Sequence, residues 1–193
     1  MKRGFDLFLA ALLLVPCLIF VGILSSIILV VDHFSPFHIQ ERVGRGGKLF
    51  RCWKLQTMRP ARNAMDIGER EKDGDRLTRL GASLRDHGWD EIPQLMNVLR
   101  GDMSFVGPRP LLPKTLNRIR GKNEEAAEAV KEWEHLRSRV RPGITGWHQV
   151  HDAGVISLMV ADGALECLPL WRRFQIIIVT IAVFFVGKKA RRA

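Results

Sequence analysis

Cysteine is scarce in this sequence, and the cysteines present do not form the pattern of a structural site. Cys17, Cys52 and Cys167 are odd in number, lie far apart and include no C-x-x-C pair. This pattern argues against a disulfide framework and against a zinc site built on cysteines, because both need paired or clustered thiols. It is typical of a reducing compartment, so we expect the folded part of the chain to be cytoplasmic.

Acidic residues are also in the minority. The sequence has 20 Asp and Glu against 30 Lys and Arg, which gives a formal net charge of +10. A strongly basic chain favours an anionic partner, namely nucleic acid, lipid head groups or a phosphorylated substrate. The sequence lacks a recognised nucleic-acid-binding motif, and its aromatic residues do not interleave with the basic ones as they do in such motifs. A nucleic-acid partner is therefore not expected.

One apolar run is long enough to enter a membrane. The 193 residues suffice for one domain with a core and are too few for two large ones. Residues 5–31 are almost wholly apolar, and about 20 such residues cross a bilayer. The run is too long for a signal peptide, and no small-residue cleavage site follows it. We expect one folded domain and one membrane element.

A proline near the middle of this run leaves its topology open. Pro16 removes one helical hydrogen bond and commonly kinks or breaks a helix, so the segment could cross the membrane or dip into one leaflet and return. Lys2 and Arg3 precede the run, and five basic residues follow it between residues 42 and 54. The positive-inside rule then favours both ends on the cytoplasmic face, as a re-entrant helix requires.

A basic, glycine-rich stretch follows the apolar run. Residues 41–62 contain seven basic residues and one acidic residue, Glu41, a net charge of +6. Glycines at positions 44, 46 and 47, and the alternation over residues 48–53, predict a short strand or hairpin after a glycine turn. The charge is explained either by a solvated loop or by attraction to anionic lipid beside a membrane anchor.

The central stretch, residues 89–110, reads WDEIPQLMNVLRGDMSFVGPRP. Apolar residues recur there at i, i+3, i+4 and i+7 and predict one face of a short helix: Ile92, Leu95, Met96 and Leu99. We expect Asp90 at the N-cap of this helix and Gly101 at its end. Pro93 is tolerated in the first turn, where its missing N–H would have had no partner.

Asp90 and Glu91 place two carboxylates at the positive end of the expected helix. They could be an ordinary cap with a favourable first-turn residue, or a reactive pair. The G-P-R-P sequence at residues 107–110 favours the reactive pair. Its two prolines restrict the backbone around Arg109 and present a guanidinium suited to bidentate phosphate binding.

These motifs resemble those of a bacterial family. The central stretch, V-R-P-G-I-T-G-W at 140–147, K-R-x-F-D at 2–6 and Q-x-R-x-G-x-x-G-K-x-F at 40–50 are similar to motifs of the bacterial sugar transferases known as monotopic phosphoglycosyl transferases, in their small single-domain form. The resemblance implies an α/β fold, mostly helical with small strand content, with an N-terminal re-entrant membrane helix and interfacial amphipathic helices. It divides the chain into the re-entrant helix, residues 1–34, and a cytoplasmic catalytic domain lying on the membrane surface, residues 35–193.

The resemblance also implies a reaction. A sugar 1-phosphate would move from a UDP-sugar to polyprenol phosphate through an aspartyl-phosphosugar intermediate, with release of UMP, at the cytoplasmic face of the bacterial inner membrane. This would be the first membrane step of exopolysaccharide, capsule or glycan assembly. Asp90 would be the nucleophile and the ligand of Mg²⁺, assisted by Glu91. Four cations would bind substrate phosphates: Lys54, Arg85, Arg109 and Arg141. The sugar, the polyprenol, the pathway and a homo-oligomeric state stay open.

The sequence departs from the family pattern at several points. Val15 stands where the family usually has a serine before the proline, and Gln56 stands where it has a cation before Thr-Met. After Gln149 the match decays, and a tyrosine-rich segment is missing because the chain has no tyrosine. These departures motivate an alternative function, a catalytically impaired membrane-bound scaffold or regulatory paralogue of the same family.

The C-terminal half carries weaker signals. Residues 116–137 have the composition of a packing helix with a solvated face, and residues 141–147 read as a Pro-Gly loop. His148, His151 and Asp152 are too few and too isolated to indicate a metal site. Residues 176–186 are apolar but too short to span a bilayer, so we expect a buried or interfacial helix with a basic tail.

Cysteines introduced before Phe5 and after Asp32 test the topology. For a re-entrant helix, a membrane-impermeant thiol reagent should label both positions only from the cytoplasmic side. Replacing Pro16 with Leu should shift the segment toward spanning, because it restores the missing hydrogen bond of a continuous helix. Labelling of the two positions from opposite sides of the membrane would establish a span.

Overall fold

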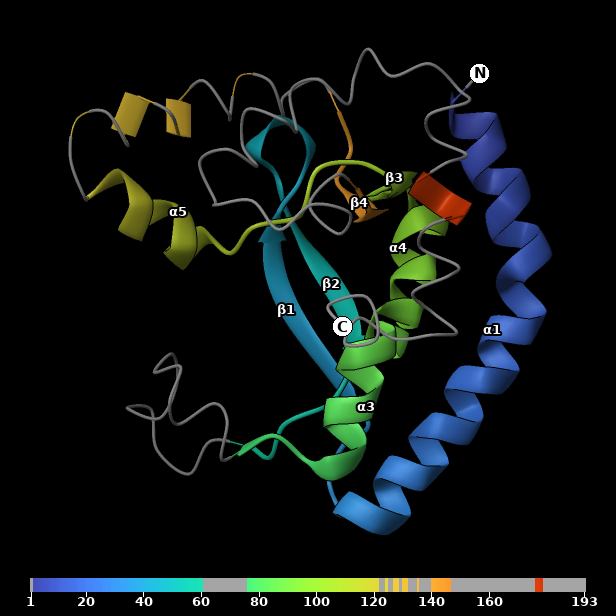
Figure 1. The fold of residues 1–193 in the computed structure, drawn as a ribbon. Coiled ribbons are helices and arrows are strands. Elements are labelled where there is room, and N and C mark those ends of the chain that lie inside the picture. Colours follow the sequence, from blue (N-terminus) through green and yellow to red (C-terminus); the bar gives the residue numbers. More distant parts are fainter. Residues whose placement is uncertain are drawn as a thin grey trace.

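The computed structural model describes residues 2–60, 76–121, 140–146 and 176–178, together with single positions between 124 and 135. In these parts the fold is mostly helical, with two small pairs of strands. Figure 1 shows a column of short helices between a long N-terminal helix on one side and a β-hairpin on the other. The predicted fold class, mostly helical with little strand, is confirmed for these residues.

The long helix α1 runs from Lys2 to Asp32 and includes Pro16. Arg3–Asp32 is long and apolar enough to cross a membrane. The helix curves along the whole body of the molecule (Figure 1). Its outer face exposes more than half of several large apolar side chains: Phe8, Leu12, Val15, Leu18, Ile19, Ile23, Leu29, Val30 and Val31. An apolar surface of this kind marks contact with lipid or another apolar partner, and the re-entrant form stays a prediction.

The short strand or hairpin predicted at the glycine turn is a hairpin. Strand β1 (Phe37–Val43) pairs antiparallel with β2 (Leu49–Leu55), with Val43 opposite Leu49. The turn between them is a 3₁₀ helix, η1 (Arg45–Gly47), in which Gly46 and Gly47 have φ of 66° and 74°. Glycine adopts such positive φ values without the steric cost that a Cβ would bring.

The central column consists of α3 (Arg79–His87), the 3₁₀ helix η3 (Trp89–Gln94) and α4 (Leu95–Arg100). Gly101, with φ of 95°, ends α4 as predicted. The predicted N-cap position of Asp90 is wrong. Gly88 adopts a left-handed conformation that both ends α3 and begins η3, so Asp90 already lies inside the first turn.

The predicted loop at residues 141–147 is partly wrong, because it contains a strand. Strand β4 (Gly143–Thr145) pairs in parallel with β3 (Ser104–Val106). A Cβ on Gly143 would lie 2.1 Å from the backbone nitrogen of Gly107, so the close approach of these two segments requires glycine. The pairing therefore depends on a contact between segments far apart in the sequence, which local composition does not show.

Helix α5 (Pro113–Arg120) follows the G-P-R-P segment and begins with proline in its first turn. It covers the start of the helix predicted over residues 116–137, and the described positions between 124 and 135 are also helical. Residues 148–152 lie outside the described residues. Of the helix predicted at residues 176–186, only Ile176–Ile178 is among the described residues. These three residues are helical, and Ile176 is buried against Val106.

Two charged residues of the K-R-x-F-D motif attach the start of α1 to the central column. Arg3 donates to the carbonyls of Val98 (2.6 Å) and Leu99 (3.1 Å) at the end of α4. Asp6 is buried and accepts hydrogen bonds from the Ser104 hydroxyl and the backbone N–H of Phe105, at 2.8 and 3.3 Å. A cation at a helix C-terminus and a carboxylate on a backbone N–H are both favourable contacts.

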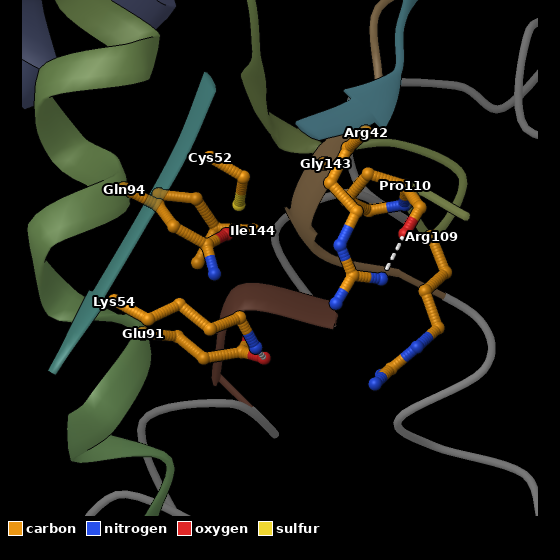
Figure 2. A pocket seen from close by; sticks show the side chains of 9 residues that line it. All are labelled: Arg42, Cys52, Lys54, Glu91, Gln94, Arg109, Pro110, Gly143 and Ile144. Atoms are coloured by element: carbon orange, nitrogen blue, oxygen red, sulfur yellow. Dashed lines mark hydrogen bonds and ion pairs between the residues drawn. The ribbon is translucent and has the colours of Figure 1, made fainter. Parts of the chain in front are cut away.

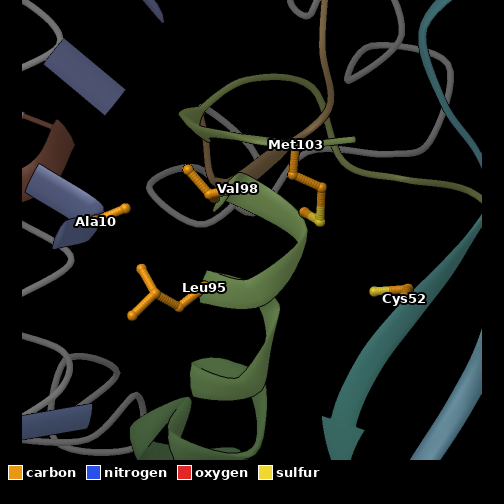
Figure 3. Close-up of a cluster of buried hydrophobic side chains, with 5 residues drawn as sticks. All are labelled: Ala10, Cys52, Leu95, Val98 and Met103. Carbon is orange, nitrogen blue, oxygen red and sulfur yellow. The ribbon is translucent and has the colours of Figure 1, made fainter. Parts of the chain in front are cut away.

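Apolar contacts continue this attachment along α1. One buried cluster joins the helix to β2 and α4 (Figure 3): Ala10, Cys52, Leu95, Val98 and Met103. A second cluster lies nearer the other end: Leu24, Ile28, Leu55 and Leu84. Each cluster contains residues from both sides of the predicted boundary between residues 34 and 35, and that boundary stays a prediction.

A buried asparagine joins the hairpin to the central column. The side chain of Asn97, on α4, is fully buried; its Oδ1 accepts from the backbone N–H of Trp53 (3.2 Å) and its Nδ2 donates to the Arg51 carbonyl (2.7 Å). Nδ2 also lies 3.3 Å from Asp102 Oδ2. The backbone carbonyl of Asn97 accepts from the N–H groups of Gly101, Asp102 and Met103. One residue therefore holds β2 against α4 and closes the turn after α4.

Replacing Asn97 with Ala should lower the free energy of unfolding by about 3 kcal/mol, because two partly buried backbone groups on β2 lose their partner and a fully buried side chain is truncated. For a chain of this size that corresponds to a fall in Tm of roughly 6–12 °C. Thermal unfolding followed by circular dichroism in detergent micelles measures the shift. Asn117→Ala, at an exposed position of α5, is the matched control, and an equally small shift for both variants would contradict the role of Asn97.

Candidate active site

The reactive pair suggested by the sequence lies against a lysine from the hairpin. Lys54 Nζ is 2.5 Å from Glu91 Oε1 and 3.9 Å from Asp90 Oδ2. All three side chains are largely shielded from solvent, and Asp90 is 7% exposed. At such short range and partial burial, the attraction between these charges is stronger than between surface charges. The contact spans 37 positions in the sequence, so the fold is what brings the carboxylates and the cation together.

One face of the hairpin forms a wall of this site. Directly opposite residues of an antiparallel pair share a face, which groups His38 with Lys54, Gln40 with Cys52 and Arg42 with Phe50. A cavity of about 10 Å³ lies beside this wall and is lined by nine residues: Arg42, Cys52, Lys54, Glu91, Gln94, Arg109, Pro110, Gly143 and Ile144. Figure 2 shows Lys54 and Glu91 on one side of it and Arg42 and Arg109 on the other.

The G-P-R-P segment places Arg109 in the cavity wall. Pro108 and Pro110 are buried, whereas Arg109 between them is exposed. The segment is fixed to β1 by two hydrogen bonds, from Arg42 Nη1 to the Pro110 carbonyl (2.9 Å) and from the Val43 N–H to the Leu111 carbonyl (3.0 Å). Before Arg109, the Gly143 N–H donates to the Pro108 carbonyl (3.0 Å), so the backbone is held on both sides of Arg109.

The other two predicted phosphate ligands do not line this cavity. Arg85 Nε donates to the Thr57 hydroxyl (2.9 Å), and the arginine is close enough to His38 to lower the pKa of its imidazole. Arg141 Nε donates to the Gly101 carbonyl (2.8 Å). Arg141 lines a second cavity of about 460 Å³ at the hairpin turn, with Arg45, Lys48 and Asp102 among its neighbours. Their phosphate-binding roles stay predictions.

The pKa shifts near the cavity reflect burial and an excess of cations. Burial, followed by the charges of Lys54 and Arg42, lowers the pKa of His38, so this histidine is neutral at pH 7. Burial raises the pKa of the Cys52 thiol against the weaker opposing effect of Lys54 and Arg42. Burial also lowers the pKa of Arg42; the charge of Arg109 lowers it further, whereas Cys52 and Glu91 oppose this shift. The cavity thus favours an anion.

The donors present suit a magnesium ion only in part. Among the residues that the structure describes, no group of three or more His, Cys, Asp or Glu side chains could hold a metal. Mg²⁺ commonly binds through one or two carboxylates and completes its shell with substrate phosphates and water. Asp90 and Glu91 meet that minimal requirement, with Lys54 beside them.

Sequence reasoning missed four residues around this site: His38, Arg42, Cys52 and Gln94. Three of them follow from the hairpin once Lys54 is placed, because positions two apart along a strand share a face. Cys52 lies two positions before Lys54 and therefore on the same face of β2. The cross-strand register places His38 and Arg42 of β1 on that face of the hairpin. The missing information was the register, which depends on the length of the turn. Gln94 carries no comparable signal, since it lies in the unexpected 3₁₀ turn.

Comparison with known proteins shows the family to which the chain belongs. The family model for the bacterial sugar transferase matches residues 1–187, and the chain belongs to this family. It is 34% identical, over 98% of its length, to the UDP-glucose:undecaprenyl-phosphate glucose-1-phosphate transferase of Escherichia coli, and 34% identical, over 93% of its length, to the protein of the same name in Caulobacter vibrioides. It is 32% identical, over 98% of its length, to the UDP-N-acetylgalactosamine-undecaprenyl-phosphate N-acetylgalactosaminephosphotransferase of Aeromonas hydrophila.

These relatives differ in length and in sugar. The chain spans 41% of the Escherichia coli protein, 45% of the Aeromonas protein and 68% of the Caulobacter protein. Two of the names contain glucose and one contains N-acetylgalactosamine, so similarity at this level does not select a sugar. All three names contain undecaprenyl phosphate.

Cys52 provides a test of how closed the cavity is. Its side chain is 1% exposed, and burial raises its thiol pKa, so at pH 8 both access and the thiolate fraction are low. We expect iodoacetamide to modify Cys52 at least about tenfold more slowly in the folded protein than in guanidinium-unfolded protein. Peptide mass spectrometry measures both rates. Equal rates would show that the hairpin face is open to solvent.

Proposed function

We propose that this protein transfers a sugar 1-phosphate from a UDP-sugar to undecaprenyl phosphate or a similar polyprenol phosphate. The observation that carries the proposal is the grouping of Asp90 and Glu91 with Lys54 beside a cavity whose opposite side is lined by Arg42 and Arg109. Carboxylates near several cations provide a nucleophile and binding groups for phosphates in one place. Family membership supports the reaction class.

The first half-reaction uses Asp90 as nucleophile. A carboxylate oxygen attacks the phosphorus that carries the sugar, the bond from that phosphorus to the bridging oxygen breaks, and UMP leaves with the electron pair. Asp90 then holds the phosphosugar as an acyl phosphate. Asp90 is not among the residues that line the cavity, and its Oδ2 lies 3.9 Å from Lys54 Nζ, so we expect the donor to move Lys54 from the carboxylates toward its phosphates.

In the second half-reaction a phosphate oxygen of the polyprenol phosphate attacks the same phosphorus. The acyl phosphate bond breaks, the Asp90 carboxylate is restored and the polyprenol diphosphate sugar is released. Glu91 holds Lys54 in position and can accept a proton from a singly protonated acceptor. Catalysis of this kind depends mainly on positioning and charge neutralisation, which Lys54 and Arg109 supply.

Magnesium is part of the proposal. Asp90 would be its main ligand, with Glu91 nearby, and the rest of its shell would come from donor phosphates and water, as Mg²⁺ prefers. When bound, the ion would neutralise charge on the diphosphate.

The membrane supplies the acceptor. The exposed apolar face of α1 would contact the lipid of the bacterial inner membrane, with the site on the cytoplasmic side, where UDP-sugars occur. An acceptor whose phosphate lies at the membrane surface could then reach a site in a body packed directly on α1.

Asp90→Asn and Glu91→Gln test the mechanism. Unaltered protein incubated with magnesium and a donor panel including UDP-glucose and UDP-N-acetylgalactosamine should release about one equivalent of UMP without acceptor, as a ping-pong scheme requires. Asp90→Asn should abolish this burst, because an amide of the same size is not a nucleophile. Glu91→Gln should slow both half-reactions, by about 10²-fold if it contributes general acid–base catalysis.

Glu41→Gln, on the exposed side of β1, removes one carboxylate from the hairpin and should leave the burst unchanged. Mass spectrometry of the Asp90 peptide identifies both the adduct and the sugar. Normal turnover by Asp90→Asn would overturn the covalent mechanism. Absence of UMP release with every donor would instead favour a scaffold that has kept the fold.

A further inference from the structure

Arg42 is an arginine of the cavity wall with an incomplete set of partners. Its Nη1 donates to the Pro110 carbonyl (2.9 Å) and its Nη2 to Gln40 Oε1 (2.5 Å). Its Nε is buried and has no hydrogen-bond partner among the described residues. A buried N–H without an acceptor is unfavourable, and Figure 2 shows this side chain reaching into the cavity next to Arg109.

Arg42 also forms no ion pair with a described residue, and the charge of Glu91 acts on it only from a greater distance. Within the described residues, the carboxylates of Asp90 and Glu91 form ion pairs with Lys54, and neither Arg42 nor Arg109 has a carboxylate within 4.0 Å. Two guanidinium groups therefore share one side of the cavity and repel each other, while partial burial makes the charge of Arg42 costly. An anion between them would offset both the repulsion and the missing hydrogen bond.

We propose that Arg42 is a phosphate-binding residue of this site, where it acts together with Arg109 on the diphosphate of the donor. This inference rests on the proposed function. The cavity of about 10 Å³ has room for a group of about the size of one water molecule, which matches a single phosphoryl oxygen rather than a sugar or a base. Guanidinium groups in a fixed orientation suit phosphate oxygens.

A different role for Arg42 would be purely structural. Its hydrogen bond to the Pro110 carbonyl could hold the loop and so orient Arg109, without any contact between Arg42 and the ligand. The two roles differ in a variant that already lacks the Arg109 guanidinium. If Arg42 only positions Arg109, its replacement should then have no further effect on anion affinity. If Arg42 binds the anion itself, its replacement should still lower that affinity.

The experiment measures the Kd of inorganic pyrophosphate by calorimetry, with the full chain in detergent micelles at constant ionic strength. Arg42→Gln should raise Kd by about tenfold or more, the effect of losing a charged hydrogen bond. It should raise Kd by a similar factor in the Arg109→Gln background. The control is Arg51→Gln, which removes the same charge from an exposed position on the other face of the hairpin and should leave Kd unchanged.

Arg42→Lys keeps the charge and provides a second variant if the glutamine variant does not fold. One ammonium group cannot hold both the Pro110 carbonyl and the anion as a guanidinium can, so Kd should still rise, by about three- to tenfold. An unchanged Kd of pyrophosphate in Arg42→Gln overturns the proposal. Where that variant does not fold, an unchanged Kd in Arg42→Lys does so. The proposal is also overturned if Arg42→Gln raises the Kd in the unaltered protein but not in the Arg109→Gln background. In each case UMP release by the unaltered protein shows that the proposed function stands. An unaltered protein that neither binds pyrophosphate nor releases UMP overturns both.

Discussion

The hydrogen bonds of one buried amide fix the relation between the two halves of the site. Asn97 pairs with the backbone of β2 on both sides of Cys52, through the Arg51 carbonyl and the Trp53 N–H. The turn that contains Glu91 leads directly into α4. The alignment of β2 along α4, which Asn97 fixes, therefore determines where Lys54 meets the Glu91 carboxylate. A slip of one residue along β2 would turn Lys54 to the opposite face of the hairpin. The ion pair thus depends on a contact that contains no charge.

The sequence predicted those parts of the fold that follow from local patterns. Alternation and glycines predicted a short strand or hairpin where β1 and β2 lie, and the apolar spacing with Gly101 predicted the end of α4. It placed Asp90 wrongly because a second glycine, Gly88, ends one helix and starts the next without an intervening cap. It missed β4, since a three-residue strand is defined by its distant partner and not by its own composition.

The site was predictable to a similar extent. Arg109 could be expected in a fixed position because its two neighbouring prolines act locally. Arg85 and Arg141 lie in the segments where the sequence predicted phosphate ligands. Their side chains, however, are directed by hydrogen bonds to the Thr57 hydroxyl and the Gly101 carbonyl. Sequence spacing contains no information on these contacts. Arg42 joins the cavity only through the strand register.

The attachment of α1 has a consequence for how the protein responds to its lipid environment. Polar contacts at Arg3 and Asp6 and two apolar clusters join this helix to the body that holds Lys54 and Glu91. The exposed apolar face of α1 and the side chains of Lys54 and Glu91 therefore belong to one packed body. A thicker or thinner bilayer changes the depth and tilt of an apolar helix at modest cost. Under the function proposed above, such a change would raise or lower Lys54 and Glu91 relative to the lipid phosphates, so bilayer thickness would itself determine how well a polyprenol phosphate is reached.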